Sequence, residues 1–171
     1  LNPWLGAPKY GGCTLSTAST IQINAHRWHA PDAEAFLGPL LLDFTFALLS
    51  VATNSPTSAP TSVPWQEIFF NDFESGTWDG WTDGGADAAL TSNANNAHSG
   101  PYALRIQDDT ASSTVTSSEI DTTSFSTIKV EFFFKPKRMT ASTEELHFDI
   151  STDGGSSFTA IKTWTNQDMT D

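Results

Sequence analysis

The sequence has very little cysteine and few basic residues. Cys13 is the single cysteine among 171 residues, so no disulfide can form within the chain. Lys and Arg number 8 against 20 Asp and Glu, which gives a formal net charge of -12. Because a phosphate backbone binds to basic protein surfaces, we expect no nucleic-acid partner.

The motifs of common enzyme classes are also missing. No glycine-rich phosphate loop, serine elbow or zinc-ligand spacing occurs in the sequence. Glu144, Glu145 and Asp149 are candidates for a paired acid and base, but on an alternating strand Glu144 faces opposite to Glu145. His98 and His147 are expected to face solvent. The sequence therefore predicts a protein that is not an enzyme.

Sustained helical periodicity is absent, and the composition divides the chain into four stretches. Residues 1–35 show no regular period, so we expect no element and poor order there. Residues 36–52 include a mostly apolar run of a length that fits the core of a secretion signal. A membrane anchor and a short amphipathic segment are the alternatives for this run, and it provides the only predicted membrane contact, if it is retained. Residues 53–64, TNSPTSAPTSVP, form a Pro/Ser/Thr linker.

The fourth stretch, residues 65–171, has the pattern of an all-β module. Short apolar or alternating runs are separated by Gly, Asn, Asp and Ser, which is typical of antiparallel strands and turns. Runs of this kind lie near residues 67–73, 102–106, 128–134, 145–150 and 158–164. Their spacing predicts a two-sheet, jelly-roll-like sandwich, with a C-terminal edge that could be incomplete. We expect residues 1–64 to pack little against it.

The most informative motifs in this module are NDFESG at residues 71–76, WDGW at 78–81 and AHSGPYALR at 97–105. Together they resemble the opening of MAM-type and related carbohydrate-binding jelly-roll modules. The linker motif PTSAPTSVP is similar to the stalks of secreted and cell-surface proteins of diatoms and related algae. These resemblances imply a sandwich on a secreted or cell-surface protein.

A calcium site is the first functional implication of this resemblance. Glu74 is the best candidate ligand, because the related modules have an acidic residue at the end of their first strand. Calcium requires six to eight oxygen ligands, and further oxygens are available in loops from Asp72, Asp79, Asp108 and Asp109. The alternative is that the Glu74 carboxylate accepts hydrogen bonds from backbone N–H groups of its own turn. The MAM pattern also has paired cysteines, which this chain lacks.

Three tryptophans are candidates for stacking on a sugar ring. The flat indole face complements the C–H bonds of a sugar, and the indole N–H can serve a hydroxyl group. Trp81 is the strongest candidate because Gly80 and Gly84 indicate an exposed turn, and Trp78 and Trp164 complete the set. Packing in the core is the alternative for each of them.

A serine- and glycine-rich stretch, STDGGSSF at residues 151–158, matches the Asp-box, a hairpin motif that ends in an aromatic residue. In this motif Asp153 ties the turn backbone, Gly154 and Gly155 supply positive φ, and Phe158 folds back under the turn. Sialidase-like propellers carry repeated copies, but this chain has one.

These features predict a non-catalytic extracellular module that binds a glycan or a cell-surface or matrix protein, with calcium as a stabilising cofactor. Two rival functions remain. One is a purely structural accessory domain, and the other is a fragment of an Asp-box glycoside hydrolase.

Overall fold

The structure, a computed structural model, describes residues 9–13, 20–28, 40–41, 46–51, 66–94, 97–107, 113–125, 127–135 and 144–169. Within these ranges the regular elements are β-strands and one 3₁₀ turn, η1 (Asn166–Met169). Every pairing between the described strands is antiparallel. The predicted all-β class is therefore confirmed.

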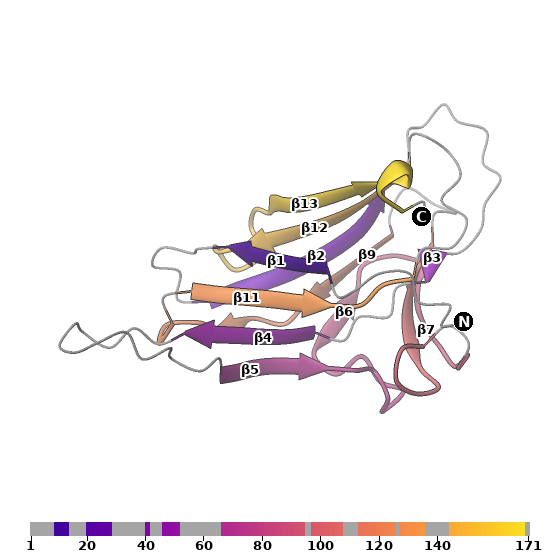
Figure 1. The fold of residues 1–171 in the computed structure, drawn as a ribbon, viewed down its shortest axis with the longest axis horizontal. Helices are drawn as coiled ribbons and strands as arrows, with labels where there is room; N and C mark the ends of the chain where they lie inside the picture. The colour runs from indigo at the N-terminus through magenta and orange to yellow at the C-terminus, as the bar shows by residue number, and fades with distance from the viewer. Residues whose placement is uncertain are drawn as a thin grey trace.

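Two large sheets form the two layers of a sandwich (Figure 1). The four-stranded sheet has the order β1 (Lys9–Cys13), β11 (Thr127–Phe132), β4 (Phe46–Val51), β5 (Gln66–Asn71). The six-stranded sheet has the order β13 (Thr159–Thr165), β12 (Glu145–Ser151), β2 (Thr20–Trp28), β9 (Ser113–Ser117), β6 (Trp81–Asp83), and β10 (Ile120–Asp121) pairs with β2. A smaller sheet of β3 (Leu40–Leu41), β8 (Ala103–Ile106) and β7 (Ala88–Thr91) lies at one end.

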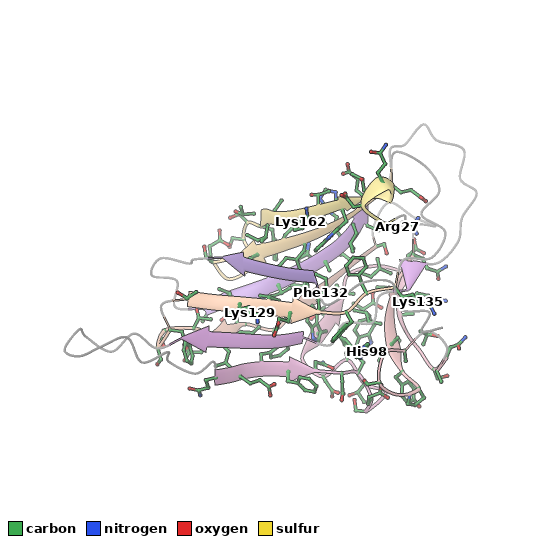
Figure 2. The ribbon with its side chains drawn as sticks, in the orientation of Figure 1. Arg27, His98, Lys129, Phe132, Lys135 and Lys162 are labelled. Atoms are coloured by element: carbon green, nitrogen blue, oxygen red, sulfur yellow. The ribbon has the colours of Figure 1, made fainter. Side chains whose placement is uncertain are left out.

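The core lies between the two large sheets and is rich in aromatic rings. Phe132 on β11 has its ring centroid 5.2 Å from that of Phe148 on β12, and 5.6 Å from that of Trp164 on β13. Figure 2 shows Phe132 near the middle of the sandwich. The inward residues Ile128, Val130 and Phe132 are all at most 2% exposed. Alternation with a period of two therefore directs one face of β11 into the core.

The strands predicted within the module are present. The expected runs near 102–106, 128–134, 145–150 and 158–164 correspond to β8, β11, β12 and β13, and the run near 67–73 corresponds to β5. Within β12, the predicted inward residues Leu146, Phe148 and Ile150 are buried. For β11 and β12 apolar alternation was sufficient, because each of these strands has one face in the core.

The expectation that residues 1–35 contain no regular element was wrong. No element was predicted in residues 1–35, but β1 lies at the edge of one large sheet and β2 lies in the middle of the other. The inward side chains of β2 include Ile21, Ile23 and Ala25, each at most 1% exposed. The expected lack of packing is therefore wrong for β2, whose inward side chains belong to the core.

The apolar segment 36–52 also contributes strands. Leu40–Leu41 forms β3, and Phe46–Val51 forms β4, which pairs with β5 on one side and β11 on the other. The remaining residues of this segment, and all of the linker 53–64, lie outside the described residues. In the part of the chain that the structure describes, no helix has the length and apolar character needed to cross a membrane.

Candidate functional site

The loop between β5 and β6, residues 72–80, contains three of the predicted calcium ligands, and the buried amide of Asn71 at the end of β5 organises it. The Asn71 side chain, on a residue that is 3% exposed, accepts a hydrogen bond from the backbone N of Phe73 at 2.7 Å and donates one to the backbone O of Asp79 at 3.0 Å. Phe73 and Asp79 both adopt positive φ, at 58° and 43°. The loop is thus held in a defined shape by bonds within it.

The carboxylates of this loop have separate partners. Asp72 accepts a hydrogen bond from the backbone N of Glu74 at 3.1 Å. Asp79 accepts from the hydroxyls of Ser75 and Thr77, and these bonds lower the pKa of Asp79. The structure therefore brings Asp72, Glu74 and Asp79 into one loop, but each carboxylate is already serving a neighbouring donor.

Glu74 reaches a second loop of the sandwich. Its carboxylate lies against Gly100, in the space that a Cβ atom on residue 100 would occupy, and it accepts a 3.5 Å hydrogen bond from Ser99 Oγ. In the same region the ring of Tyr102 lies 3.1 Å from the position of a Cβ on Gly76. The NDFESG and HSGPY motifs are therefore packed together.

The calcium site stays a prediction. Among the residues that the structure describes, no group of three or more His, Cys, Asp or Glu is arranged to hold a metal ion. Asp108 and Asp109, two of the predicted ligands, lie outside the described residues.

The predicted sugar-stacking role does not agree with the position of two tryptophans. Trp81 is 5% exposed and Trp164 is 4% exposed, and both belong to the core cluster. The exposed position expected for Trp81 is wrong, because its ring turns inward and lies 6.2 Å from that of Phe73. Trp78 is half-buried and packs against the same core.

The hairpin between β12 and β13 is closed by hydrogen bonds to Asp153. Its Oδ1 accepts from the backbone N of Ser157 at 2.9 Å and from Ser151 Oγ at 2.7 Å. The hydroxyl of Ser157 donates a third bond, to Asp153 Oδ2, at 2.6 Å. This bond, together with the two bonds to Oδ1, lowers the pKa of Asp153 to about 2. Gly154 and Gly155 have φ of 69° and 82°. Phe158, which was expected to fold back under this turn, is 37% exposed.

A second set of polar side chains lies on the six-stranded sheet, on the face directed away from the core. We call this set the polar face. Alternate residues of four adjacent strands contribute to it, and all of them except Glu145 lie opposite another member in the register. Its members are Asn24, His26, Thr114, Thr116, Glu145, His147, Asp149 and Thr163.

Two histidines form the centre of the polar face. His26 on β2 is directly opposite His147 on β12, and their rings are stacked with centroids 4.6 Å apart and planes 5° apart. Each ring contacts one carboxylate. His26 Nδ1 lies 3.1 Å from Asp149 Oδ2, and His147 Nε2 lies 3.0 Å from Glu145 Oε2.

Asn24 joins the histidines to the neighbouring strand. Its Oδ1 accepts hydrogen bonds from the hydroxyls of Thr114 and Thr116 on β9, and its Nδ2 donates to Asp149 Oδ2 at 3.4 Å. Thr163 on β13 contacts His147 Nδ1 at 3.3 Å. The polar face is therefore one connected network across β13, β12, β2 and β9.

Asp149 is the most deeply buried acid of the polar face. Its side chain is 8% exposed, and its Oδ1 has no hydrogen-bond partner in the described structure. Burial acts to raise the pKa of Asp149, but the hydrogen bond and charge of His26, with smaller contributions from Asn24 and His147, together hold that pKa below its usual value. The carboxylate is therefore ionised at neutral pH.

Sequence reasoning did not find the polar face. Glu145, His147 and Asp149 were recognised on one strand, but their partners Asn24 and His26 lie in a stretch where no element was expected. The available signal was the alternation of Ile21, Ile23 and Ala25, which places Asn24 and His26 on the opposite face of a strand.

Comparison with known proteins adds no assignment: no family model, no curated protein and no solved structure matches this chain. The resemblance to MAM-type modules and the Asp-box match stay predictions.

Proposed function

We propose that this chain is a non-catalytic glycan-binding module of a secreted or cell-surface protein, and that it binds its ligand on the polar face. The observation that supports this proposal is the connected row of amide, imidazole, carboxylate and hydroxyl groups across four strands. Sugar hydroxyls both donate and accept hydrogen bonds, so a surface that offers both kinds of group suits them. A rigid sheet also holds these groups at fixed spacings.

The part of the polar face that a ligand reaches first is formed by the two histidines and Glu145. The side chains of His26, His147 and Glu145 are 29%, 20% and 32% exposed, whereas that of Asp149 is 8% exposed. Asn24 and Asp149 lie deeper and position the exposed groups. We therefore assign direct contact to the histidines and Glu145, and positioning to Asn24 and Asp149.

The proposal is tested by binding to a panel of neutral, amino and acidic oligosaccharides, followed by variants. Replacing His147 with Ala removes one stacked imidazole, and we expect it to weaken binding of the best ligand by about tenfold, the equivalent of one lost hydrogen bond. The matched control is His98→Ala, since His98 is also stacked on a ring, that of Phe133, but lies outside the polar face (Figure 2).

A second matched pair tests the carboxylate. Glu145 and Glu131 are both partly exposed and each is paired with a basic residue two positions away, but Glu131 is on β11 of the other sheet. Glu145→Gln is expected to weaken binding, and Glu131→Gln is expected to leave it unchanged. Equal effects from the two variants would refute the polar face as the binding surface.

The structural accessory domain is a second candidate, and one observation favours it. The side-chain oxygen and nitrogen of Asn24 both form hydrogen bonds within the network. Part of the hydrogen-bonding capacity of the polar face is therefore already used within the protein. If this alternative is correct, the panel shows no binding, and His147→Ala lowers only thermal stability.

A further inference from the structure

The residues 9–28 form what we call the N-terminal arm, which places one strand in each large sheet. β1 lies at an edge and pairs with β11, while β2 lies between β12 and β9 (Figure 1). In the described pairings β1 and β2 are not partners of each other. The arm is therefore not a hairpin, and its contacts are with distant parts of the chain.

β2 fills the place between β9 and β12, which we call the groove, and side-chain contacts hold it in register there. Ile23 donates its backbone N to Ser117 Oγ at 2.9 Å, and Gln22 Nε2 donates to the backbone O of Ser117 at 3.2 Å. At the other end Arg27 and Glu144 form an ion pair in which the side chains are 0% and 4% exposed. Both ends of the groove thus fix the register of β2.

Each charge of a buried ion pair requires the opposite charge beside it. Removing either charge leaves the other in a medium that solvates it poorly, so a groove containing Glu144 discriminates strongly in favour of a strand with a cation at this position. Figure 2 shows Arg27 at the end of β2. The groove therefore favours a strand that has a cation at the position of Arg27, as β2 does.

We propose that this groove also accepts β2 from a second copy of the chain, so that two copies exchange their N-terminal arms and form a dimer. The strands that pair with β2 all lie far along the chain, from Arg27 and Ser113, 86 positions apart, upward. No hairpin ties it to either neighbour, so the same contacts form within one chain or between two. Eleven residues, 29–39, connect β2 to β3 and reach about 40 Å when extended.

The exchange has a consequence for the polar face. Asn24 and His26 belong to β2, whereas Glu145, His147 and Asp149 belong to β12. In the dimer each polar face is therefore assembled from two chains. The exchange itself does not depend on the proposed function, because it follows from the pairing of β2 alone.

Charge reversal of the buried pair distinguishes exchange from folding within one chain. Arg27→Glu and Glu144→Arg are made in separate full-length chains, and each chain alone has two like charges in its groove. An exchanged heterodimer restores an opposite pair in both grooves. We expect the two chains, unfolded and refolded together, to melt at the temperature of the double variant R27E/E144R, and to show twice the 18.5 kDa mass of one chain by light scattering.

The double variant R27E/E144R is also the control for this experiment. Recovery of the single-chain double variant without recovery of the mixture would overturn the proposal. If the reversed pair does not fit even in the double variant, a second set decides: Asn24→Cys and Thr116→Cys, which are register partners, in chains that carry Cys13→Ser. A disulfide between the two chains after joint refolding supports exchange, and its absence excludes it. Wild-type glycan binding, measured separately, tests the proposed function independently.

Discussion

The carboxylate of Glu74 occupies the space that a side chain on residue 100 would need, so these two residues restrict each other. The contact joins the loop after β5 to the turn before β8, and it explains why a glycine stands in the middle of AHSGPY.

Replacing Gly100 with Ala is therefore expected to destabilise the protein by about 1–3 kcal/mol, since the new methyl group must displace the Glu74 carboxylate. The free energy of unfolding in urea measures this cost. In an E74A background the same substitution is expected to cost clearly less, because the obstruction is gone. Equal costs in both backgrounds would show that the contact has no energetic weight.

Replacing Arg27 with Met is expected to destabilise the protein by about 3–5 kcal/mol, because it leaves the buried Glu144 carboxylate without its guanidinium partner. The matched control is Lys129→Met, since Lys129 and Glu131 form a partly exposed pair on the other sheet. That substitution is expected to cost about 0–1 kcal/mol. Urea unfolding of both variants gives the comparison, and similar losses would contradict the burial of the Arg27 pair.

The pH dependence of stability should include a contribution from Asp153. Its pKa in the folded protein is about 2, below the usual 3.8, so the hydrogen bonds of the ionised form stabilise the hairpin above about pH 4. This contribution is lost as pH falls toward 2. We expect the melting temperature of wild type to exceed that of Asp153→Asn at pH 6, and the gap to close between pH 4 and pH 2. A gap that stays constant over this range would contradict the assignment.

The calcium prediction is tested by thermal melting with calcium and with a chelator. A ligand that binds only the folded state at about 100 times its dissociation constant stabilises it by about 2.7 kcal/mol. Glu74→Gln is expected to abolish most of this gain, whereas Glu67→Gln, on the exposed part of β5, leaves it intact. Magnesium is expected to stabilise less. Identical melting with calcium and chelator would leave Glu74 with only its packing role against Gly100.

Part of the fold could be predicted from the sequence because some strands have one buried face and one exposed face. Ile128, Val130 and Phe132 alternate with Lys129 and Glu131, so the pattern alone identifies β11 and its inward face. The same alternation identifies β12, but it does not reveal that Asp149 is also buried, next to the register shift between Phe148 and Asp149.

A strand near residues 21–25 could have been recognised from its alternation, but its place between β9 and β12 could not be predicted, for a physical reason. Its inward residues are Ile21, Ile23, Ala25 and then Arg27, and a charged residue at an inward position ends the apolar pattern. Arg27 is tolerated there only because Glu144, which lies far along the chain, faces it. Local patterns contain no information on such a partner.

Trp81 was predicted to be exposed, but its side chain is buried. Glycines beside it indicated an exposed turn, and the turn is present, with positive φ at Asp79 and Gly80. The turn reverses the chain so that the indole points into the core toward Phe69 and Phe73. An exposed backbone therefore does not imply an exposed side chain.

The central position of β2 also affects the time course of folding. During synthesis β2 emerges before β9 and β12, so it must remain unpaired until those two strands have been made. Until β2 docks, β9 and β12 each have an unpaired edge. Unpaired edges can form hydrogen bonds with strands of other chains, which leads to aggregation. Pairing over such long sequence separations is slow. The strand that completes the sheet is therefore also the step at which a newly made chain is most exposed to aggregation.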